Sequence, residues 1–312
     1  IGIGFGNNSD LYYFPFRHQQ VGTNLPSECL SALIAWLNTT KHLVGYNIKF
    51  DLRFLEKEGL VVEDKDLVDV LTMVRLTEPS TVKDLDLTNT IKRSYGEKHA
   101  SYDIETKKLL RSNKWHKDFS MAPVDVLGPY CEKDVLYTAK LYNDRSKLIK
   151  DTNQGNVWKM QMALTKVLYV MEGDGIKINN KYVKETMVKI EDRKTEILKR
   201  VLNLAGKEFN LNSTQQLGEV LNERGIKSPE KTAKGKQSWN EAALVQINDP
   251  IAGYVRQYRA LEKLRSTYLE PFLELEELHT TFCNWGTLTG RLSSRSPNLQ
   301  NIPRNHFNLV DK

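Results

Sequence analysis

The hydrophobic and polar positions follow two different patterns on either side of a polar, turn-like stretch, DTNQG, at residues 151–155. In the first part, IGIGF and LYYFPF read as two strands joined by the turn GNNSD, and residues 27–38 then show helical periodicity. HLVGYN predicts another short strand, and FDLRFLEKEG predicts a helix that ends at Gly59. Further helices are expected at residues 66–76, 82–95 and 122–149. Strands that alternate with helices predict an α/β fold for residues 1–150.

The second part is almost entirely helical. Its apolar residues recur at spacings of three and four, and glycine closes the first two segments, which predicts long amphipathic helices. These helices are expected at residues 156–175, 181–206 and 251–278, the last interrupted or ended near Pro271. From His279 the composition shifts to Thr, Asn, Gly and Pro. The pattern therefore predicts three segments, at residues 1–150, 151–280 and 281–312.

Length and composition set the broad class of protein. The 312 residues fit two domains and part of a third, and the apolar fraction of 40% is ample for buried cores. No run approaches about 18 consecutive apolar residues, and the first residues carry neither a charged n-region nor a cleavage site. We therefore expect a soluble, cytoplasmic protein that is not secreted and has no membrane partner. The chain begins without Met inside a predicted strand, which suggests that an upstream segment is absent.

The cysteines and the net charge narrow the choice of partners. Cys29, Cys131 and Cys283 lie far apart without a CxxC spacing, so buried thiols are expected instead of a disulfide framework or a zinc site. The net charge of +6 weakly favours a polyanionic partner. Lysines are concentrated in the stretch KSPEKTAKGKQS at residues 227–238.

Two short constellations could carry chemistry. Asn47, Phe50 and Asp51 lie where the HLVGYN strand meets the next helix, a place where an α/β sheet exposes side chains at its carboxyl edge. The alternative for Asp51 is a helix cap. Tyr130 and Asp134 are four residues apart, so they share one helix face. There a carboxylate can hold a divalent ion while the phenol orients a water, although a solvated helix face is the alternative.

The order of these and later motifs resembles one family. VGYNIKFDLRFL and, some eighty residues later, YCEKDV are similar to the second and third motifs of the proofreading exonuclease of family A DNA polymerases. Later strings resemble the thumb and early palm of those polymerases, in the right order: KVLYVMEGDGIKI, EFNLNSTQQLGEVL, KTAKGKQSWNEAAL, YRALEKLRSTYLEPF and TFCNWGTLTGRLSSRSPNLQNIPR. The last string is the most specific.

The resemblance implies an architecture and a set of site residues. Residues 1–150 would be a ribonuclease H-like α/β 3′–5′ exonuclease domain, a mixed sheet with helices that lacks its first strand. Residues 151–280 would be a mainly helical thumb, and 281–312 the start of an α+β palm. Asp51 and Asp134 would be metal ligands, with Asn47 and Phe50 shaping the pocket and Tyr130 positioning the attacking water. Two Mg²⁺ or Mn²⁺ ions are expected in the complete exonuclease site, since two such ions can stabilise the entering and leaving oxygens.

A second carboxylate pair, Asp103 and Glu105 in YDIET, imitates the Asp-x-Glu motif that opens such nuclease sites. The family carries that motif on the first strand, which would lie before Ile1. The surrounding stretch is highly charged and lacks an apolar run, so we expect the solvated start of a helix instead. The nuclease site would then hold too few carboxylates for two ions.

Several residues are expected to contact DNA. Lys231, Lys234 and Lys236 could reach phosphates, and a mobile solvated loop is the alternative. Arg291 resembles the family arginine that reaches the minor groove, where donors test base-pair geometry without reading sequence. Three polar residues near it look like its neighbours along primer and template, although a polar loop bonded to itself would explain any one of them: Asn298, Gln300 and Asn301.

The resulting hypothesis is a part of a family A DNA-directed DNA polymerase, a replicative nucleotidyltransferase with proofreading and phage-like short connections, from a bacterial or phage-infected cell. Primer-template DNA and single-stranded 3′ ends would be its partners, while dNTP would bind only the complete enzyme, because the palm aspartates follow NLQNIP in the family. A processivity factor cannot be named. The alternatives are a DNA-binding subunit of a split polymerase and a stand-alone 3′–5′ exonuclease.

Overall fold

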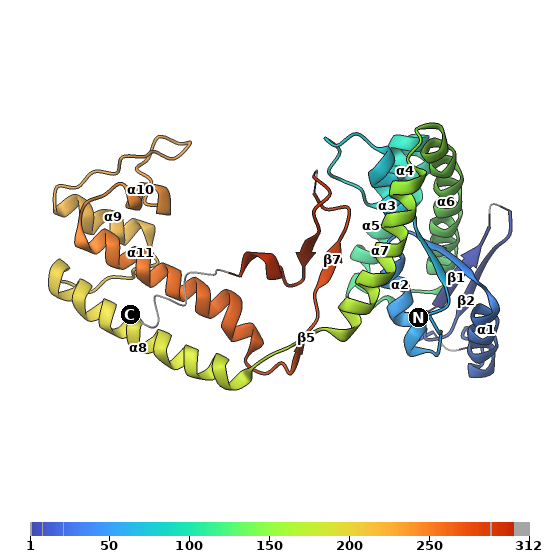
Figure 1. The fold of residues 1–312 in the computed structure, drawn as a ribbon, viewed down its shortest axis with the longest axis horizontal. Coiled ribbons are helices and arrows are strands. Elements are labelled where there is room, and N and C mark those ends of the chain that lie inside the picture. Colours follow the sequence, from blue (N-terminus) through green and yellow to red (C-terminus); the bar gives the residue numbers. More distant parts are fainter. Residues whose placement is uncertain (1, 8, 21, 288, 303–312) are drawn as a thin grey trace. The chain divides into compact units, whose positions relative to one another are not determined.

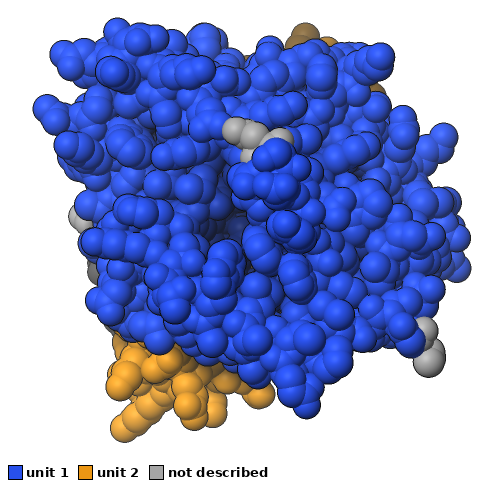
Figure 2. Space-filling view, turned by 90° about the vertical axis from the view of Figure 1, so that its right-hand side faces the viewer, with its two compact units in different colours: residues 1–173, 282–293 blue, residues 174–281, 294–312 orange. Residues whose placement is uncertain are grey.

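The computed structural model describes residues 2–7, 9–20, 22–287 and 289–302. The chain divides into two compact units, which Figure 2 shows in different colours. Unit 1 comprises residues 1–173 and 282–293, and unit 2 comprises residues 174–281 and 294–312. These limits differ from the expected segments, because the helix after residue 155 and a short return segment both pack with the N-terminal part. The assignment of exonuclease, thumb and palm domains stays a prediction.

Unit 1 combines four short strands with helices (Figure 1). The strands are β1 (Gly2–Gly6), β2 (Leu11–Pro15), β3 (His42–Gly45) and β4 (Asp66–Asp69). The α-helices are α1 (Ser27–Thr39), α2 (Ile48–Lys57), α3 (Val70–Thr77), α4 (Leu87–Tyr95), α5 (Ser101–Ser112), α6 (Val124–Asp151) and α7 (Gly155–Asp174). Short 3₁₀ turns are η1 (Glu97–Ala100), η2 (Trp115–Lys117) and η3 (Phe119–Met121).

The strands of unit 1 form two separate two-stranded sheets among the described residues. β1 and β2 pair antiparallel, with Gly2 opposite Pro15, and β3 and β4 pair parallel, with His42 opposite Asp66. The single mixed sheet expected from the sequence is therefore not formed by these strands. Because β1 and β3 each pair on one side only, each leaves one backbone edge without a partner strand in the part of the chain described here.

Helix α6 joins the two sheets, since it packs against β1, β2 and β3. It approaches β1 so closely that a Cβ atom added at Gly4 would lie 2.3 Å from Sγ of Cys131. Only glycine leaves room for this contact. The sequence of β1 thus determines how near α6, and the candidate residues it carries, can lie to the sheets.

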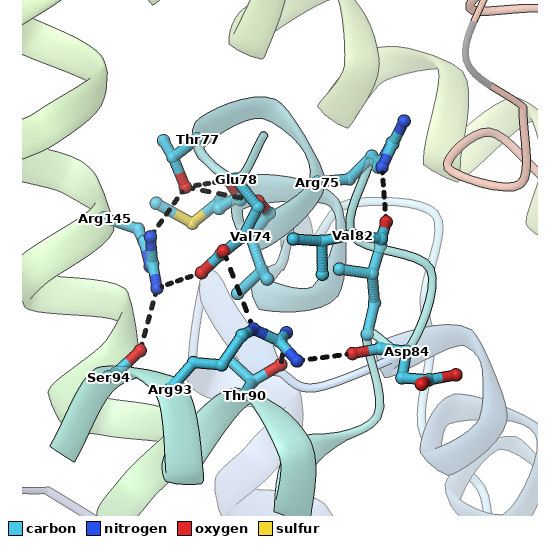
Figure 3. Close-up of polar contacts among 12 residues, drawn as sticks. Val74, Arg75, Thr77, Glu78, Val82, Asp84, Thr90, Arg93, Ser94 and Arg145 are labelled. Carbon is cyan, nitrogen blue, oxygen red and sulfur yellow. Dashed lines mark hydrogen bonds and ion pairs between the residues drawn. The ribbon is translucent and has the colours of Figure 1, made fainter. Parts of the chain in front are cut away.

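A buried ion-pair network fixes α3 and α4 against α6 (Figure 3). Glu78, directly after α3, pairs with Arg145 of α6 at 2.7 Å, and both side chains are almost fully enclosed. Arg93 of α4 lies 3.6 Å from the other carboxylate oxygen. Arg145 also donates to the hydroxyl groups of Thr77 and Ser94. Buried charges are tolerated when they are paired and hydrogen-bonded in this way.

The return segment 282–293 is held in unit 1 by polar contacts to three helices. Its first residue, Phe282, donates its N–H to Glu172 of α7 at 2.7 Å and accepts from Nζ of Lys49 in α2 at 2.6 Å. The amide of Asn284 donates to Gln161 of α7 at 2.9 Å. Trp285 packs against the hydrophobic cluster between α3 and α6. These contacts join a segment that is remote in sequence to the helix carrying Asp51.

Unit 2 is mainly helical (Figure 1). Its helices are α8 (Asn180–Ala205), α9 (Thr214–Glu223), α10 (Glu241–Val245) and α11 (Pro250–Lys263). Helix α11 continues as the π-helix η4 (Leu264–Leu269) and the 3₁₀ turn η5 (Glu270–Phe272), and a separate 3₁₀ turn, η6 (Leu299–Asn301), follows later in the chain. Two residue pairs form β5 (Ile176–Lys177) and β6 (Glu277–Leu278). Strands β7 (Thr281–Cys283) and β8 (Ser293–Arg295) pair with each other where the chain passes from one unit to the other. The core consists of side chains from α8, α9 and α11 that repeat at helical spacing, including Ile190, Ile197, Leu217, Leu221, Ile251 and Val255.

Several helix predictions are confirmed, and three need correction. The helices expected at 27–38, 122–149 and 181–206 are present, with ends that differ by at most two residues. Residues 66–69 form strand β4 instead of a first helical turn, because parallel pairing with β3 satisfies their backbone. Helix α4 begins at Leu87, not at residue 82. The last long helix ends near Pro271 as expected, but residues 273–278 turn and enter β6.

Candidate functional site

Asp51 lies in the first turn of α2, directly beyond the end of β3. Asn47 precedes the helix with φ 59° and ψ 49°, a left-handed conformation that asparagine tolerates better than most residues. Its side chain makes no capping hydrogen bond. Asp51 retains access to solvent, and its carboxylate sits where the positive end of the helix dipole favours an acid. The expected junction of strand and helix is therefore present.

A second carboxylate at the same edge, Asp69, was missed from the sequence. Because β3 and β4 are parallel, their carboxyl ends coincide, and Asp69 pairs in register with Gly45. Oδ1 of Asp69 accepts the N–H groups of Asn47 at 2.9 Å and Leu71 at 3.1 Å, and Oδ2 accepts from Thr72. Burial raises the pKa of Asp69. The expectation of a helix at 66–76 hid its position at a strand end.

Asp134 projects from α6 into a group of aromatic residues. The hydroxyl of Tyr102, on α5, donates to Oδ1 of Asp134 at 2.7 Å. The ring of Tyr102 stacks on that of Tyr137, one turn further along α6, with centroids 5.7 Å apart and planes 9° from parallel. Tyr102 is thus a direct partner of a candidate catalytic carboxylate, and sequence reasoning did not identify it.

Tyr130 contacts Asp103, which corrects the expectation for that aspartate. Asp103 does lie in the first turn of a helix, α5, and Glu105 is exposed as expected. Asp103, however, is buried, and it accepts from Tyr130 at 3.1 Å and from Thr88 at 2.6 Å. Nζ of Lys107 forms an ion pair with Oδ2 of Asp103 at 2.9 Å. Asp103 can be buried because Tyr130 of α6, Thr88 of α4 and Lys107 of its own helix satisfy its carboxylate.

The carboxyl groups of Asp51 and Asp134 both have raised pKa values. Desolvation raises the pKa of each carboxyl from 3.8 to about 6. For Asp51 the charges of Asp69 and Asp134 add to this effect, and for Asp134 the charge of Asp103 does. The pKa of Cys131 rises to about 12, first through burial and then through Asp134 and Asp51 together. Repulsion between neighbouring carboxylates of this kind is relieved when a cation binds between them.

These raised pKa values, caused first by desolvation and then by neighbouring charges, predict a pH-dependent stability in EDTA. Since the folded pKa values of about 6 exceed the unfolded value of 3.8, the folded protein binds these protons more tightly. The resulting stabilisation is complete below the unfolded pKa and is lost as the pH rises through 6. Urea unfolding should therefore show a larger loss of stability between pH 5 and 7 for the unmodified protein than for the Asp51→Asn, Asp134→Asn variant. Equal losses would contradict the raised pKa values.

The residues present fit part of a divalent metal site. Hard cations such as Mg²⁺ take oxygen ligands, and Asp51 and Asp134 supply two carboxylates with raised pKa values. Among the described residues, no three His, Cys, Asp or Glu side chains gather closely enough to hold a metal ion. The two candidate ligands do not by themselves complete a two-ion site.

Phe50 is one of two exposed aromatic residues beside Asp51. It is 61% exposed, and its ring lies 5.1 Å from that of Phe54, which is 57% exposed, one turn along α2. Exposed rings at this spacing could contact unstacked bases. Asn47 donates its backbone N–H to Asp69, and the expected part of Asn47 in shaping the pocket stays a prediction.

The lysines expected to contact phosphates lie on an ordered hairpin-like loop. Lys231 and Gln237 form an antiparallel bridge, and Thr232 donates its N–H to the carbonyl oxygen of Lys236 at 2.7 Å. Lys231, Lys234 and Lys236 are all exposed. The backbone contacts bring three cations together at one loop tip, where counterions or phosphates can reach them.

The four residues expected near the primer end are divided between the units. Arg291 is exposed in unit 1, where its carbonyl oxygen accepts from Thr287. In unit 2, Oδ1 of Asn298 caps η6 by accepting from the N–H of Gln300 at 3.0 Å. The carbonyl oxygen of Asn301 accepts from Tyr268 of η4 at 2.8 Å. Asn298 therefore organises its own loop, and the DNA contacts of all four residues remain predictions.

No helix in the described part of the chain has the length and apolar composition that a membrane crossing requires.

The model of the family "DNA polymerase family A" matches residues 180–309. DNA polymerase I of Chloroflexus aurantiacus is 30% identical over 97% of this chain, which spans 33% of that relative's length. The thermostable DNA polymerase I of Thermus thermophilus is 40% identical over 46% of this chain and 18% of its own length.

A solved structure gives a similar result for the fold. The POL domain of Pol1 from M. smegmatis, in complex with DNA primer-template and dNTP, matches with a TM-score of 0.62 and 20% identity. The match covers 94% of this chain and 47% of that chain. The chain thus spans about a third of the curated relatives that it matches over nearly its whole length. From the family model and the sequence relatives, this chain belongs to DNA polymerase family A.

Proposed function

We propose that the chain is part of a DNA-directed DNA polymerase with a 3′–5′ proofreading exonuclease, acting in DNA replication in a bacterial or phage-infected cell. On this proposal, residues 1–150 are a ribonuclease H-like exonuclease domain, 151–280 a thumb and 281–312 the start of a palm. The observation that supports the exonuclease assignment is the position of Asp51 directly beyond the end of β3 and of Asp134 on α6, the helix that packs against β1, β2 and β3.

Each residue of the proposed nuclease site has a distinct task. Asp51 and Asp134 would hold Mg²⁺ or Mn²⁺, which when bound lowers the pKa of a water and stabilises charge on the phosphate oxygens. Tyr130 would orient the attacking water through its hydroxyl, which Asp103 holds at 3.1 Å. Burial and the charges of Asp134 and Asp103 raise the pKa of Tyr130, so the phenol keeps its proton as a donor. Phe50 would contact the terminal base.

The proposed site needs further carboxylates for activity. Two Mg²⁺ ions beside a phosphate require about three or four carboxylates, of which Asp51 and Asp134 would supply two. The unpaired edges of β1 and β3 are compatible with an additional strand between them. We propose that the nuclease motif Asp-x-Glu on such a strand, and the palm aspartates, are not among these 312 residues.

The purified chain is accordingly expected to show little excision of a single-stranded 3′ end and no primer extension with Mg²⁺ and dNTPs. Both assays use the same labelled oligonucleotides, and a complete DNA polymerase I serves as the positive control. If the chain excises the 3′ end robustly and the Asp103→Ala variant does not, then Asp103 is a metal ligand and its exclusion from the proposed site is wrong. Nucleotide addition by the purified chain would contradict the proposal that the palm aspartates are not among its residues.

DNA binding is the activity that the chain should retain, and it provides the main test. Phosphate contacts release counterions, so affinity for primer-template should fall steeply as salt rises, with a logarithmic slope of about −0.9 per phosphate contact. Changing Lys231, Lys234 and Lys236 to Gln should weaken binding similarly for different sequences and reduce the slope. Fluorescence anisotropy at several salt concentrations measures both quantities. Binding that is undetectable or independent of salt would refute the proposal.

A further inference from the structure

A small cavity lies directly beside the tyrosine that contacts Asp134. It has a volume of about 240 Å³ and is lined by Lys98, His99, Ser101, Tyr102, Lys133 and Tyr137. The residues come from η1, the first turn of α5 and the middle of α6. None of the lining residues is acidic, and three of the six carry a basic side chain. The cavity therefore favours an anion.

The two lysines are available to such a ligand. Lys98 and Lys133 are exposed, and neither forms an ion pair with any described residue. Nζ of Lys133 lies 5.3 Å from the ring centroid of Tyr102, a cation–π distance that holds the ammonium at the cavity wall. On the same helix, Lys140 lies 5.5 Å from the ring centroid of Tyr137, which adds a further positive charge nearby.

The uncharged groups of the cavity can also donate to an anion. Nδ1 of His99 lies 2.9 Å from the hydroxyl of Tyr137. Burial raises the pKa of Tyr137, so the phenol is protonated and can donate to Nδ1. Nε2 of His99 then carries the ring proton and is a donor. Ser101, at the first position of α5, offers a hydroxyl at the positive end of the helix.

The size of the cavity suits a phosphate group better than a whole nucleotide. Sites for drug-sized ligands usually occupy about 300–1,000 Å³, which exceeds the 240 Å³ found here. A phosphate that belongs to a longer chain can enter with only part of its sugar.

We propose that this cavity binds a backbone phosphate of single-stranded DNA whose 3′ end is directed toward Asp134. This inference rests on the proposed exonuclease function, because the hydroxyl of Tyr102 connects the cavity wall to that carboxylate. The lysines compensate the negative charge of the strand close to acidic residues that would otherwise repel it. The cavity acts in substrate positioning and does not touch the reacting phosphate.

The test measures binding of a 5′-labelled eight-nucleotide oligo(dT) to the full 312-residue chain by fluorescence anisotropy in EDTA. The variant Lys98→Gln, Lys133→Gln should bind at least about tenfold more weakly, since charge-assisted contacts to a phosphate are lost. Its salt slope should decrease by about 0.7, the value for one single-strand phosphate contact. The variant Lys98→Arg, Lys133→Arg should retain the affinity of the unmodified chain.

The matched control is Lys108→Gln, Lys147→Gln. It changes the net charge equally, on exposed positions of α5 and α6 outside the cavity. Equal affinity loss in the control would show only nonspecific attraction and would overturn the proposal, as would no loss in the cavity variant. Competition by dTMP or inorganic phosphate at the same concentration as the oligonucleotide would overturn the backbone assignment in favour of a terminal phosphate.

The binding experiments distinguish an error in the cavity proposal from an error in the proposed function. If the unmodified chain binds primer-template with a steep salt dependence while the cavity variant binds oligo(dT) normally, only the cavity proposal is wrong. If the unmodified chain binds neither DNA, both are wrong. Circular dichroism melting of each variant separates a binding defect from a folding defect.

Discussion

Replacing Lys49 by Met is expected to destabilise unit 1 by about 3–5 kcal/mol, because a buried ion pair loses one partner. The side chain of Lys49 is 5% exposed and that of Glu172 is 9% exposed. Nζ of Lys49 donates to Oε1 of Glu172 and to the carbonyl oxygen of Phe282. Met fills a similar volume but cannot donate, so the carboxylate loses its ammonium partner while still buried.

Two measurements detect the loss of stability in the Lys49→Met variant. Urea unfolding monitored by circular dichroism gives the stability loss, and hydrogen exchange reports the N–H of Phe282, which donates to Glu172. That amide should exchange much faster in the variant, since the return segment 282–293 depends on the pair. Both measurements address unit 1 directly, which matters because a chain with two units need not unfold in one step.

The controls use the same helix and the same pair. Lys57→Met removes an exposed lysine of α2 and should change stability by no more than about 0.5 kcal/mol. The double variant Lys49→Met, Glu172→Gln should be more stable than the sum of the single changes predicts, because no buried charge is left uncompensated. If Lys49→Met behaves like Lys57→Met, the buried pair does not hold the return segment.

Asp69→Ala is expected to destabilise the protein by about 3 kcal/mol or more, as the sum of a lost helix cap and buried donors without acceptors. Asp69 is 1% exposed and receives hydrogen bonds from Asn47, Leu71 and Thr72. Alanine replaces none of them. The bond from Asn47 also holds the left-handed turn that aims Asp51, so the change should disturb the candidate site as well as the fold.

Asp69→Asn separates these hydrogen bonds from the charge. Its amide oxygen can accept from Asn47 and Leu71, and its NH₂ group can donate to Thr72, while no charge remains to be desolvated. The variant should stay within about 1 kcal/mol of the unmodified protein at pH 7. Because the charge of Asp69 helps to raise the pKa of Asp51, that pKa should fall below about 6. Carboxyl titration by NMR measures it, and an unchanged value or a loss as large as for Ala would contradict this account.

The long helices and the family resemblance could be predicted because they depend on local patterns. Helix α8 shows its apolar residues at spacings of three and four and ends before Gly206 at φ 71°, so its limits are encoded within the segment itself. Asp51 and Asp134 were identified from short motifs whose residues lie on one helix turn or at one strand end. Local geometry of this kind does not depend on distant parts of the chain.

Strand β4 and the partners of the candidate residues could not be predicted in the same way. Residues 66–69 become a strand because β3 offers parallel hydrogen bonds, and Asp69 gains its role from the edge so formed. Asp103 is buried because Tyr130, Thr88 and Lys107 satisfy its carboxylate, which no spacing within YDIET indicates. The return of residues 282–293 to Lys49 is equally nonlocal.

The sequence by itself determined the periodic helices, the motif residues and the family to which the chain belongs. Only the tertiary structure decided which carboxylates are buried, which side chains hold them and which lysines surround a cavity. The physical reason is that periodicity acts over one or two turns of chain, whereas burial and pKa values depend on groups that approach from segments a hundred residues away.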